Sequence, residues 1–236
     1  MVKVVQDDRL PKIEAFAKIE MYEEVTASCT IEDSSFALGT ISGKLLIYQL
    51  DNLVSQSDLD SEIISIFPYG DGVIAASNMG LVQFLDKIPT WEINVTSGID
   101  NFVFSGVFGY FSDSNGEVVV IDSEGNQIYS QFHEDVNRLA ASEDGDLFAI
   151  AKTDGTLIIS TPSNELLQNS SADESDIETI SQICFRQDGV LLACRDSLGF
   201  TLDDGPENRL ECWHSVRGLL RMSELPAISS SILPTK

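Results

Sequence analysis

Residues with catalytic potential are sparse in this chain. The two histidines are His133, which precedes Glu134-Asp135, and His214, which follows Cys212-Trp213. On a β-strand Cys212 and His214 would lie on the same side, where a thiol and an imidazole can form a nucleophile and its base. That chemistry needs a third group to orient the base, and the sequence shows none nearby. We therefore expect a strand with a buried Trp213 and no catalytic residue.

Two loops carry patterns that are similar to ligand-binding loops but differ from them in detail. The segment from Gly39 to Lys44 is one residue short of a phosphate-binding loop, and Leu45 stands where Ser or Thr should bind magnesium. Glu143 to Asp146 lacks the spaced ligands and the closing Glu of a calcium loop. The four cysteines form no Cys-x-x-Cys pair of the kind that binds zinc or exchanges disulfides. The sequence predicts no metal ion and no cofactor, and we expect no enzyme activity.

The charge of the chain is strongly unbalanced. Its 236 residues include 38 Asp and Glu but 14 Lys and Arg, which gives a formal net charge of -24. Phosphate backbones would be repelled, so we expect no direct nucleic-acid partner, whereas a basic protein or peptide would be attracted. The alternative is that the acidity only favours solubility or reflects a salt-adapted proteome. No basic and then apolar leader follows Met1, and no apolar run approaches the ~20 residues needed to cross a bilayer, so we expect a cytoplasmic protein without membrane contact.

A hairpin pattern recurs along the chain. The stretch from Leu147 to Ser160, LFAIAKTDGTLIIS, reads as two apolar strands joined by an Asp-Gly turn, which supplies the positive φ angles that tight hairpins need. Four similar stretches occur, and the five turn glycines are spaced by 37, 36, 39 and 44 residues. These glycines are Gly43, Gly80, Gly116, Gly155 and Gly199. Such a period indicates a repeat architecture.

Each hairpin is preceded by an apolar segment and followed by a more polar one, so each repeat contains four short strands. Four strands in about 40 residues are typical of a propeller blade, whose fourth strand lies on the wet outer rim. In the fifth repeat we place the hairpin at Val190 to Leu202 and the fourth strand at Arg209 to His214. The fold class is thus an all-β propeller of four-stranded antiparallel blades. The predicted units are residues 25–62, 63–98, 99–135, 136–179 and 180–215.

Three of the four cysteines fall on equivalent positions of these repeats. Cys29 and Cys184 lie on first strands, 14 and 15 residues before their turn glycines. Cys194 stands where the other repeats have Leu, Ala, Phe or Ile. We therefore expect all three to fill the hydrophobic core.

The third strand of these repeats resembles that of WD-repeat β-propellers. Asp154 to Ile159, DGTLII, matches the beginning of that strand, and Leu85-Asp86 and Ile121-Asp122 occupy the place of the family's Trp-Asp pair. Tyr48-Gln49 and Ser160-Thr161 depart from that pair, and no repeat shows the family's Gly-His signature. The resemblance implies that the loops between second and third strands share one face with the connections between blades.

The chain ends should close the ring, because a blade buries its faces only against neighbouring blades. The resemblance covers about residues 25–215, which leaves residues 1–24 and 216–236. Each end contains two apolar segments separated by a turn, so we expect the two ends to form one composite blade. The prediction is a single domain with six blades. The alternative is a piece of a longer protein with seven or eight blades.

Acidic residues gather in the loops that the resemblance places on one face. A ring of carboxylates around one mouth of a disc would steer a basic partner toward that mouth. We therefore expect a non-catalytic protein–protein interaction scaffold with an acidic loop face. The predicted partner-binding residues are Asp58, Asp60, Glu62, Asp113, Glu134, Asp135, Asp154, Asp176 and Asp196.

The sequence leaves two other functions open. One is a propeller enzyme or small-ligand binder, which would need polar side chains converging in the central channel; Arg138 and Arg195 are the best candidates for such a role. The other is a fragment of a subunit of a larger assembly that contains a propeller. Several polar side chains aimed at one point of the channel would favour the first of these functions over the scaffold.

Overall fold

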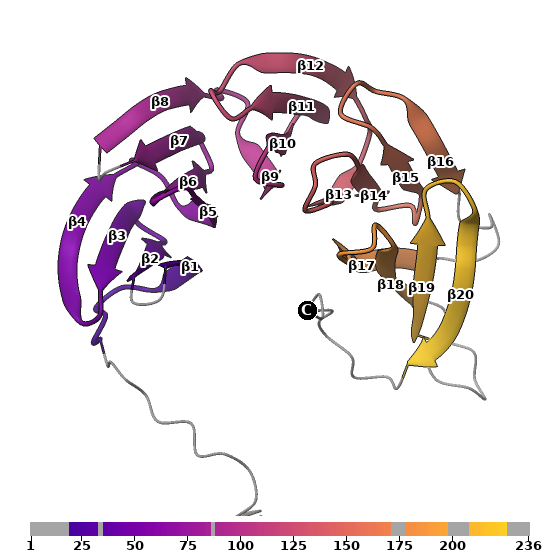
Figure 1. Cartoon of the computed structure of the whole chain (residues 1–236), viewed down its shortest axis with the longest axis horizontal. Helices are drawn as coiled ribbons and strands as arrows, with labels where there is room; N and C mark the ends of the chain where they lie inside the picture. Colours follow the sequence, from indigo (N-terminus) through magenta and orange to yellow (C-terminus); the bar gives the residue numbers. More distant parts are fainter. Residues whose placement is uncertain (1–18, 33–34, 86–87, 171–177, 198–207, 226–236) are drawn as a thin grey trace, which may run out of the picture.

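The computed structural model describes residues 19–32, 35–85, 88–170, 178–197 and 208–225. Within these ranges every regular element is a β-strand, and the strands form five four-stranded antiparallel sheets in which consecutive strands pair. Figure 1 shows the sheets arranged in an arc, with the first strand of each sheet innermost and the fourth outermost. We call the sheets blades 1 to 5 in chain order. The prediction of an all-β propeller with four-stranded blades is confirmed.

The strands have similar lengths from blade to blade. Blade 1 contains β1 (Val25–Glu32), β2 (Ser35–Thr40), β3 (Lys44–Gln49) and β4 (Asn52–Asp58). Blade 2 contains β5 (Ile63–Tyr69), β6 (Gly72–Ser77), β7 (Gly80–Leu85) and β8 (Ile88–Asn94). Blade 3 contains β9 (Ile99–Phe104), β10 (Phe108–Asp113), β11 (Glu117–Asp122) and β12 (Gln127–Phe132). Blade 4 contains β13 (Val136–Ala141), β14 (Phe148–Lys152), β15 (Leu157–Ser160) and β16 (Leu166–Ser170).

Blade 5 corrects the sequence prediction. It contains β17 (Glu178–Phe185), β18 (Leu191–Ser197), β19 (Asn208–His214) and β20 (Gly218–Leu225). β19 is the third strand, not the fourth, because it pairs directly with β18, with Leu191 opposite Trp213. β20 pairs with β19 as the fourth strand, so the segment from Val216 to Met222, which we had assigned to the closing blade, largely belongs to blade 5. The expected turn at Gly199 and the terminal segments 1–18 and 226–236 lie outside the described residues.

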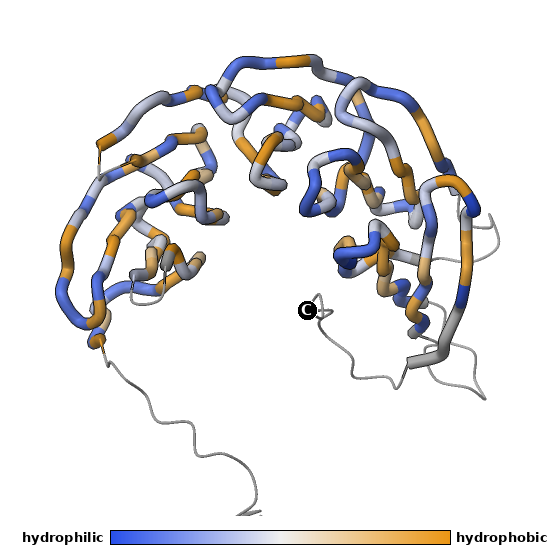
Figure 2. The backbone as a smooth tube through the Cα atoms, in the orientation of Figure 1, coloured by the Kyte–Doolittle hydropathy of each residue, from blue (hydrophilic) through white to orange (hydrophobic). Residues whose placement is uncertain are grey.

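The middle strands are the most buried, because in blades 2 to 4 neighbouring blades cover both of their faces. β6 is buried at every position and β7 at all but its last. β8 and β12 have no buried position, as expected of strands on the outer rim. Figure 2 shows hydrophilic and hydrophobic residues alternating along these outer strands. The described part of the chain contains no helix long and apolar enough to cross a membrane.

Each pair of adjacent blades encloses its own hydrophobic core. Leu45 of blade 1 packs in the same core as Ile63 of blade 2. Tyr110 of blade 3 stacks on Phe148 of blade 4, with ring centroids 4.8 Å apart. Similar cores lie between blades 2 and 3 and between blades 4 and 5. Among the described residues, the outward faces of blades 1 and 5 are therefore the two that no other blade covers.

Glycine is required in the turns that join second and third strands. Gly43 has a φ of 91°, and a Cβ atom there would lie 2.6 Å from the carbonyl oxygen of Ser61. Gly116 and Gly155 have positive φ angles as well. These are the conformations that the turn pattern predicts. The turn at Gly80 differs, because the two residues before this glycine form the turn.

Candidate partner-binding face

The turns between second and third strands share one face with the connections between blades. Leu59 N donates to Gly43 O at 2.9 Å, which joins the connection after blade 1 to the turn of that blade. Asn78 N donates to Glu62 O at 3.0 Å, which joins the same connection to the turn of blade 2. Equivalent main-chain bonds recur between the following blades. We call this side of the arc the turn face.

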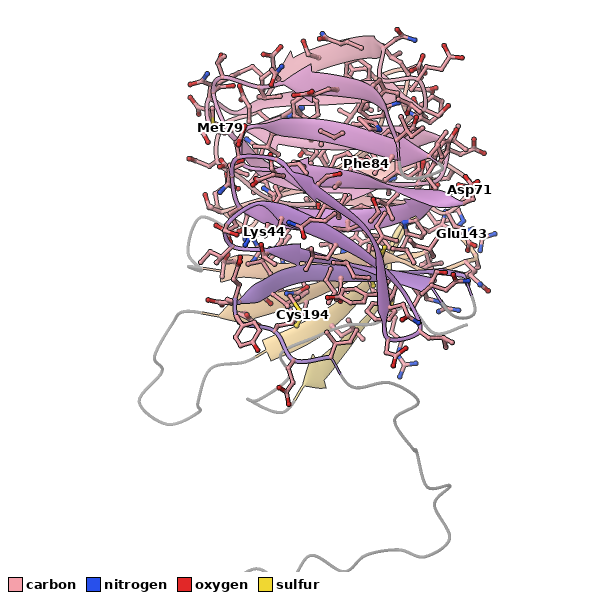
Figure 3. All side chains as sticks on the ribbon, turned by 90° about the vertical axis from the view of Figure 1, so that its left-hand side faces the viewer. Lys44, Asp71, Met79, Phe84, Glu143 and Cys194 are labelled. Atoms are coloured by element: carbon pink, nitrogen blue, oxygen red, sulfur yellow. The ribbon has the colours of Figure 1, made fainter. Side chains whose placement is uncertain are left out.

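Acidic side chains are present on both faces of the arc. Figure 3 shows Lys44 and Met79 on the turn face, with Asp71 and Glu143 at the opposite edge. Several carboxylates on that opposite side cap turns; Asp122, for example, accepts bonds from the main-chain N–H groups of two later residues. Net charge alone therefore does not distinguish the two faces, and a binding site has to be identified from shape and from carboxylates that lack a partner.

The structure describes eight of the nine predicted partner-binding residues. Those with exposed side chains are Asp58, Asp60, Glu134, Asp135 and Asp154. Glu62 and Asp196 are half-buried, and Asp113 is only 7% exposed. Asp176 lies outside the described residues. The exposed residues do not form one continuous ring, because most of them belong to two separate depressions.

The first depression, which we call the acidic cleft, lies between blades 3 and 4. It has a volume of about 340 Å³, and its lining includes Asp113, Glu134 and Asp135. Asp100, a residue of β9 that the sequence interpretation missed, lies beside them. Asp100 could have been found from its position, because it is an exposed acidic residue next to the buried Ile99 at the start of a strand.

Asp113 has a structural role within the acidic cleft. Its carboxylate accepts hydrogen bonds from Ser97 Oγ (2.6 Å) and from the main-chain N–H groups of Asn115 (3.1 Å) and Glu117 (2.7 Å). These bonds hold the turn between β10 and β11 and tie it to the connection from blade 2. The acidic residues of this cleft with exposed side chains are Asp100, Glu134 and Asp135.

The second depression, which we call the groove, lies between blades 1 and 2. It has a volume of about 280 Å³, and its acidic lining comprises Asp58, Asp60 and Glu92. The apolar side chains of Met79 and Phe84 lie in the same groove. The prediction included neither Glu92 nor Met79, because it considered only acidic residues in loops. Glu92 is on the outer strand β8, and Met79 carries no charge.

The remaining predicted residues lie outside these two depressions. The Glu62 carboxylate is 3.4 Å from the side-chain amide of Asn78. Asp154 accepts a bond from Thr156 N at 2.9 Å and so caps its own turn. Asp196 lies near the thiol of Cys194, with 3.9 Å between the carboxylate oxygen and Sγ.

The histidines do not form a catalytic pair with their neighbours. Nδ1 of His214 accepts a hydrogen bond from Val216 N at 3.1 Å, so this nitrogen is used in the turn after β19. Burial and the nearby charge of Lys152 lower the pKa of His133. Within the described ranges, no three His, Cys, Asp or Glu side chains are grouped so that they could hold a metal ion.

Of the three cysteines predicted to fill the core, Cys194 is buried, whereas Cys29 and Cys184 are half-buried. Cys29 packs against the core between blades 1 and 2, and burial raises the pKa of its thiol to about 11. Burial also raises the pKa of Cys184. Cys194 is 2% exposed. Because the thiolate is the reactive form of cysteine, the raised pKa values lower the reactivity of Cys29 and Cys184 at neutral pH.

Arg195, one of the two channel candidates, is instead a structural residue between blades 4 and 5. It forms a two-point ion pair with Glu211, with N–O distances of 3.1 and 3.2 Å, and donates to Gly155 O at 2.7 Å. Glu211 also accepts bonds from Trp213 Nε1 (2.9 Å) and Arg209 Nε (3.0 Å). Because Arg195 is 3% exposed, it does not reach the central channel.

Arg138, the other candidate, is exposed on the inner strand β13. Its Nε donates to Ser181 O of blade 5 at 3.1 Å, and its Nη1 atom donates to Asn137 O at 2.8 Å. Arg138 therefore links two first strands. The two arginines do not converge on one point of the channel.

Comparison with solved structures confirms the resemblance to WD-repeat propellers at the level of the fold. The chain is similar to the β-propeller domain of Myceliophteria thermophila Cps50 (Swd1), with 14% identity and a TM-score of 0.64, over 86% of this chain and 74% of that one. It is similar to the Neurospora crassa Pan2 WD40 domain, with 14% identity and a TM-score of 0.62, over 85% of this chain and 65% of that one. A computationally designed protein, Ika8, is also similar, with 14% identity and a TM-score of 0.66, over 84% of this chain and 61% of that one.

The chain covers only part of each matched structure. The chain spans less than two thirds of Ika8 and of the Pan2 domain, and about three quarters of the Cps50 domain. No protein-family model and no curated protein matches the sequence.

Proposed function

We propose that this propeller is a non-catalytic protein–protein interaction scaffold that presents its acidic turn face to a basic partner. The observation that carries the proposal is the pair of depressions on that face, each lined by exposed carboxylates that the sequence had singled out. Stacked blades with separate cores make a rigid platform, which lowers the entropic cost of binding. The net charge of -24 would speed the encounter with a cationic protein.

A charge-neutralised variant tests this proposal. The turn-face variant carries Asp60→Asn, Glu62→Gln, Asp135→Asn and Asp176→Asn. We expect it to bind a Lys-rich peptide roughly tenfold more weakly than the unmodified chain at low salt, because exposed ion pairs contribute about 0.2–1 kcal/mol each. Fluorescence anisotropy of a labelled peptide, recorded at low and high salt, measures the effect.

The matched control removes the same charge from the opposite face. It carries Asp71→Asn, Glu124→Gln, Glu143→Gln and Asp146→Asn, all at exposed positions. We expect this control to retain most of the binding. Equal losses in the two variants would show that the peptide responds to net charge rather than to the turn face and would reject the proposal.

We also propose that a sixth blade, built from residues 1–18 and 226–236, closes the arc between blades 5 and 1. Two features of the described blades support closure. Phe36 and Tyr48 of blade 1 stack with ring centroids 5.4 Å apart and belong to the face of blade 1 that is directed away from the core shared with blade 2. Leu192 and Cys212, paired on adjacent strands, belong to the corresponding face of blade 5. Faces with such residues are covered by a neighbour everywhere else in the arc.

Thiol labelling of the full chain tests closure. We expect Ile232→Asp to speed the reaction of Cys212 with a maleimide, because a charge in the apolar C-terminal segment would loosen the proposed blade. The rate at Cys29, which lies between blades 1 and 2, should stay unchanged and serves as the internal reference. Thr235→Asp adds the same charge outside the apolar run and should have little effect. If Cys212 reacts at the same rate in all three proteins, the sixth blade is rejected.

A further inference from the structure

The groove between blades 1 and 2 combines an apolar floor with an acidic rim. Phe84 is 3% exposed and lies at the base, whereas Met79 is 51% exposed and lies at the edge of the turn face. Figure 3 looks onto this side of the molecule and shows Met79 at the turn face and Phe84 further toward the edge where Asp71 lies. Pro89, from the outer strand β8, adds a further apolar surface. The groove thus offers carbon contacts that a purely charged surface lacks.

Three carboxylates surround this apolar floor. Asp58, Asp60 and Glu92 are all exposed, and among the described residues none of them pairs with a cation. Lys44, which lies opposite Asp58 in the sheet, is bound to Glu23 instead. The Asp58 carboxylate accepts a hydrogen bond from Asp60 N at 3.0 Å, as in a capped turn. Among the described residues the groove therefore presents carboxylates without a cationic partner next to buried carbon.

The volume of the groove limits the size of its occupant. At about 280 Å³ it lies just below the roughly 300–1,000 Å³ of sites that hold drug-sized ligands. One long side chain fits this scale better than a folded surface or a large ligand. Lysine and arginine are the side chains that carry a flexible apolar stem and a cationic end.

We propose that the groove binds a single lysine or arginine side chain of the partner. The stem lies along the apolar side of the groove beside Met79, and the cation is held by Asp58, Asp60 and Glu92. This inference rests on the proposed function, because it specifies how the acidic turn face recognises a basic partner. It differs from general charge attraction in requiring the stem as well as the charge.

A series of short peptides tests both requirements on the full chain. Each peptide has one central residue, which is lysine, norleucine or diaminopropionic acid, within the same neutral sequence. Norleucine keeps the stem without the charge, and we expect binding roughly three- to tenfold weaker than with lysine. Diaminopropionic acid lacks three methylenes and keeps the charge at pH values below the pKa of its β-amino group, so the series is recorded at mildly acidic pH. We expect its binding to be at least roughly tenfold weaker than that of the lysine peptide. Methyl NMR of the methionines measures binding, with Met79 expected to shift and Met21 expected to stay unchanged.

A pair of matched variants locates the site. We expect Glu92→Gln in the groove to weaken binding of the lysine peptide, whereas Glu134→Gln in the acidic cleft should leave it unchanged. Equal binding of the lysine and diaminopropionic acid peptides, or equal losses in the two variants, would overturn the groove assignment while leaving the acidic face intact. Absence of any shift at Met79 would overturn it as well. The proposed function is rejected by a different result, which is an equal loss of peptide binding in the turn-face variant and in its opposite-face control.

Discussion

Replacing Glu211 by glutamine is expected to lower the free energy of unfolding by about 3 to 5 kcal/mol. Glu211 and Arg195 are each 3% exposed, so the substitution removes one of the two charges of a buried ion pair. Urea unfolding followed by far-UV circular dichroism measures the loss. Tryptophan fluorescence is less suitable, because Trp213 itself donates to Glu211.

Two controls make this result specific. Glu117→Gln makes the same change at an exposed residue of β11 and should alter stability by less than about 0.5 kcal/mol. The double variant Arg195→Met with Glu211→Leu should recover much of the loss, since apolar replacement of both partners of a buried pair is often neutral. Recovery is expected to be incomplete, because Trp213 Nε1 loses its acceptor. A loss below about 1 kcal/mol for Glu211→Gln would show that the pair does not hold blade 5 against blade 4.

The same pair should make stability depend on pH. Burial alone would raise the pKa of Glu211, but the hydrogen bonds and charge of Arg195 outweigh burial and bring the pKa below the ordinary value of 4.5. A carboxyl with a lower pKa in the folded state stabilises the fold above its unfolded pKa and loses this contribution as the pH falls through the folded pKa. The stability difference between the natural chain and Glu211→Gln should therefore be full at neutral pH and shrink below about pH 4.

The local features of this fold could be predicted from the sequence. A turn that needs a positive φ favours glycine wherever it occurs, so Gly43, Gly116 and Gly155 marked three hairpins before any tertiary contact was known. Strands covered on both faces are continuously apolar, which identified β14 and β15 in the stretch from Leu147 to Ser160. The blade pattern follows from these two signals because both depend on residues close together in the chain.

The error in blade 5 arose from a contact between distant residues. With the hairpin placed at Val190 to Leu202, the more polar segment from Arg209 to His214 was predicted as the outer strand, although it contains the buried Glu211. Its partner Arg195 is on a different strand, and nothing in the local pattern of either strand indicates the pairing.

The candidate site could likewise be predicted only in part, because some of its residues come together only in the fold. The exposed acids of the loops were predicted, but Glu92 and the apolar floor at Phe84 become neighbours of Asp58 only when blade 2 packs on blade 1.

Replacing Phe148 by alanine should also cost about 3 to 5 kcal/mol, because it removes a large side chain from a closed core. Phe148 is 2% exposed and stacks on Tyr110, which is fully buried, between blades 3 and 4. Since blades in a repeat fold contact only their neighbours, the loss falls on one interface near the middle of the arc. We expect a lower urea midpoint and a broader transition, as the two sides of that interface begin to unfold separately.

The matched control for this prediction is Phe132→Ala. Phe132 is 62% exposed on the outer strand β12, so its removal should change stability by less than about 0.5 kcal/mol. A second comparison, Phe148→Leu, retains apolar volume and should cost less than alanine. A sharp transition with an unchanged midpoint in Phe148→Ala would mean that the core between blades 3 and 4 does not couple them. The stack of blades would then be held together by other contacts, such as the main-chain bonds of the turn face.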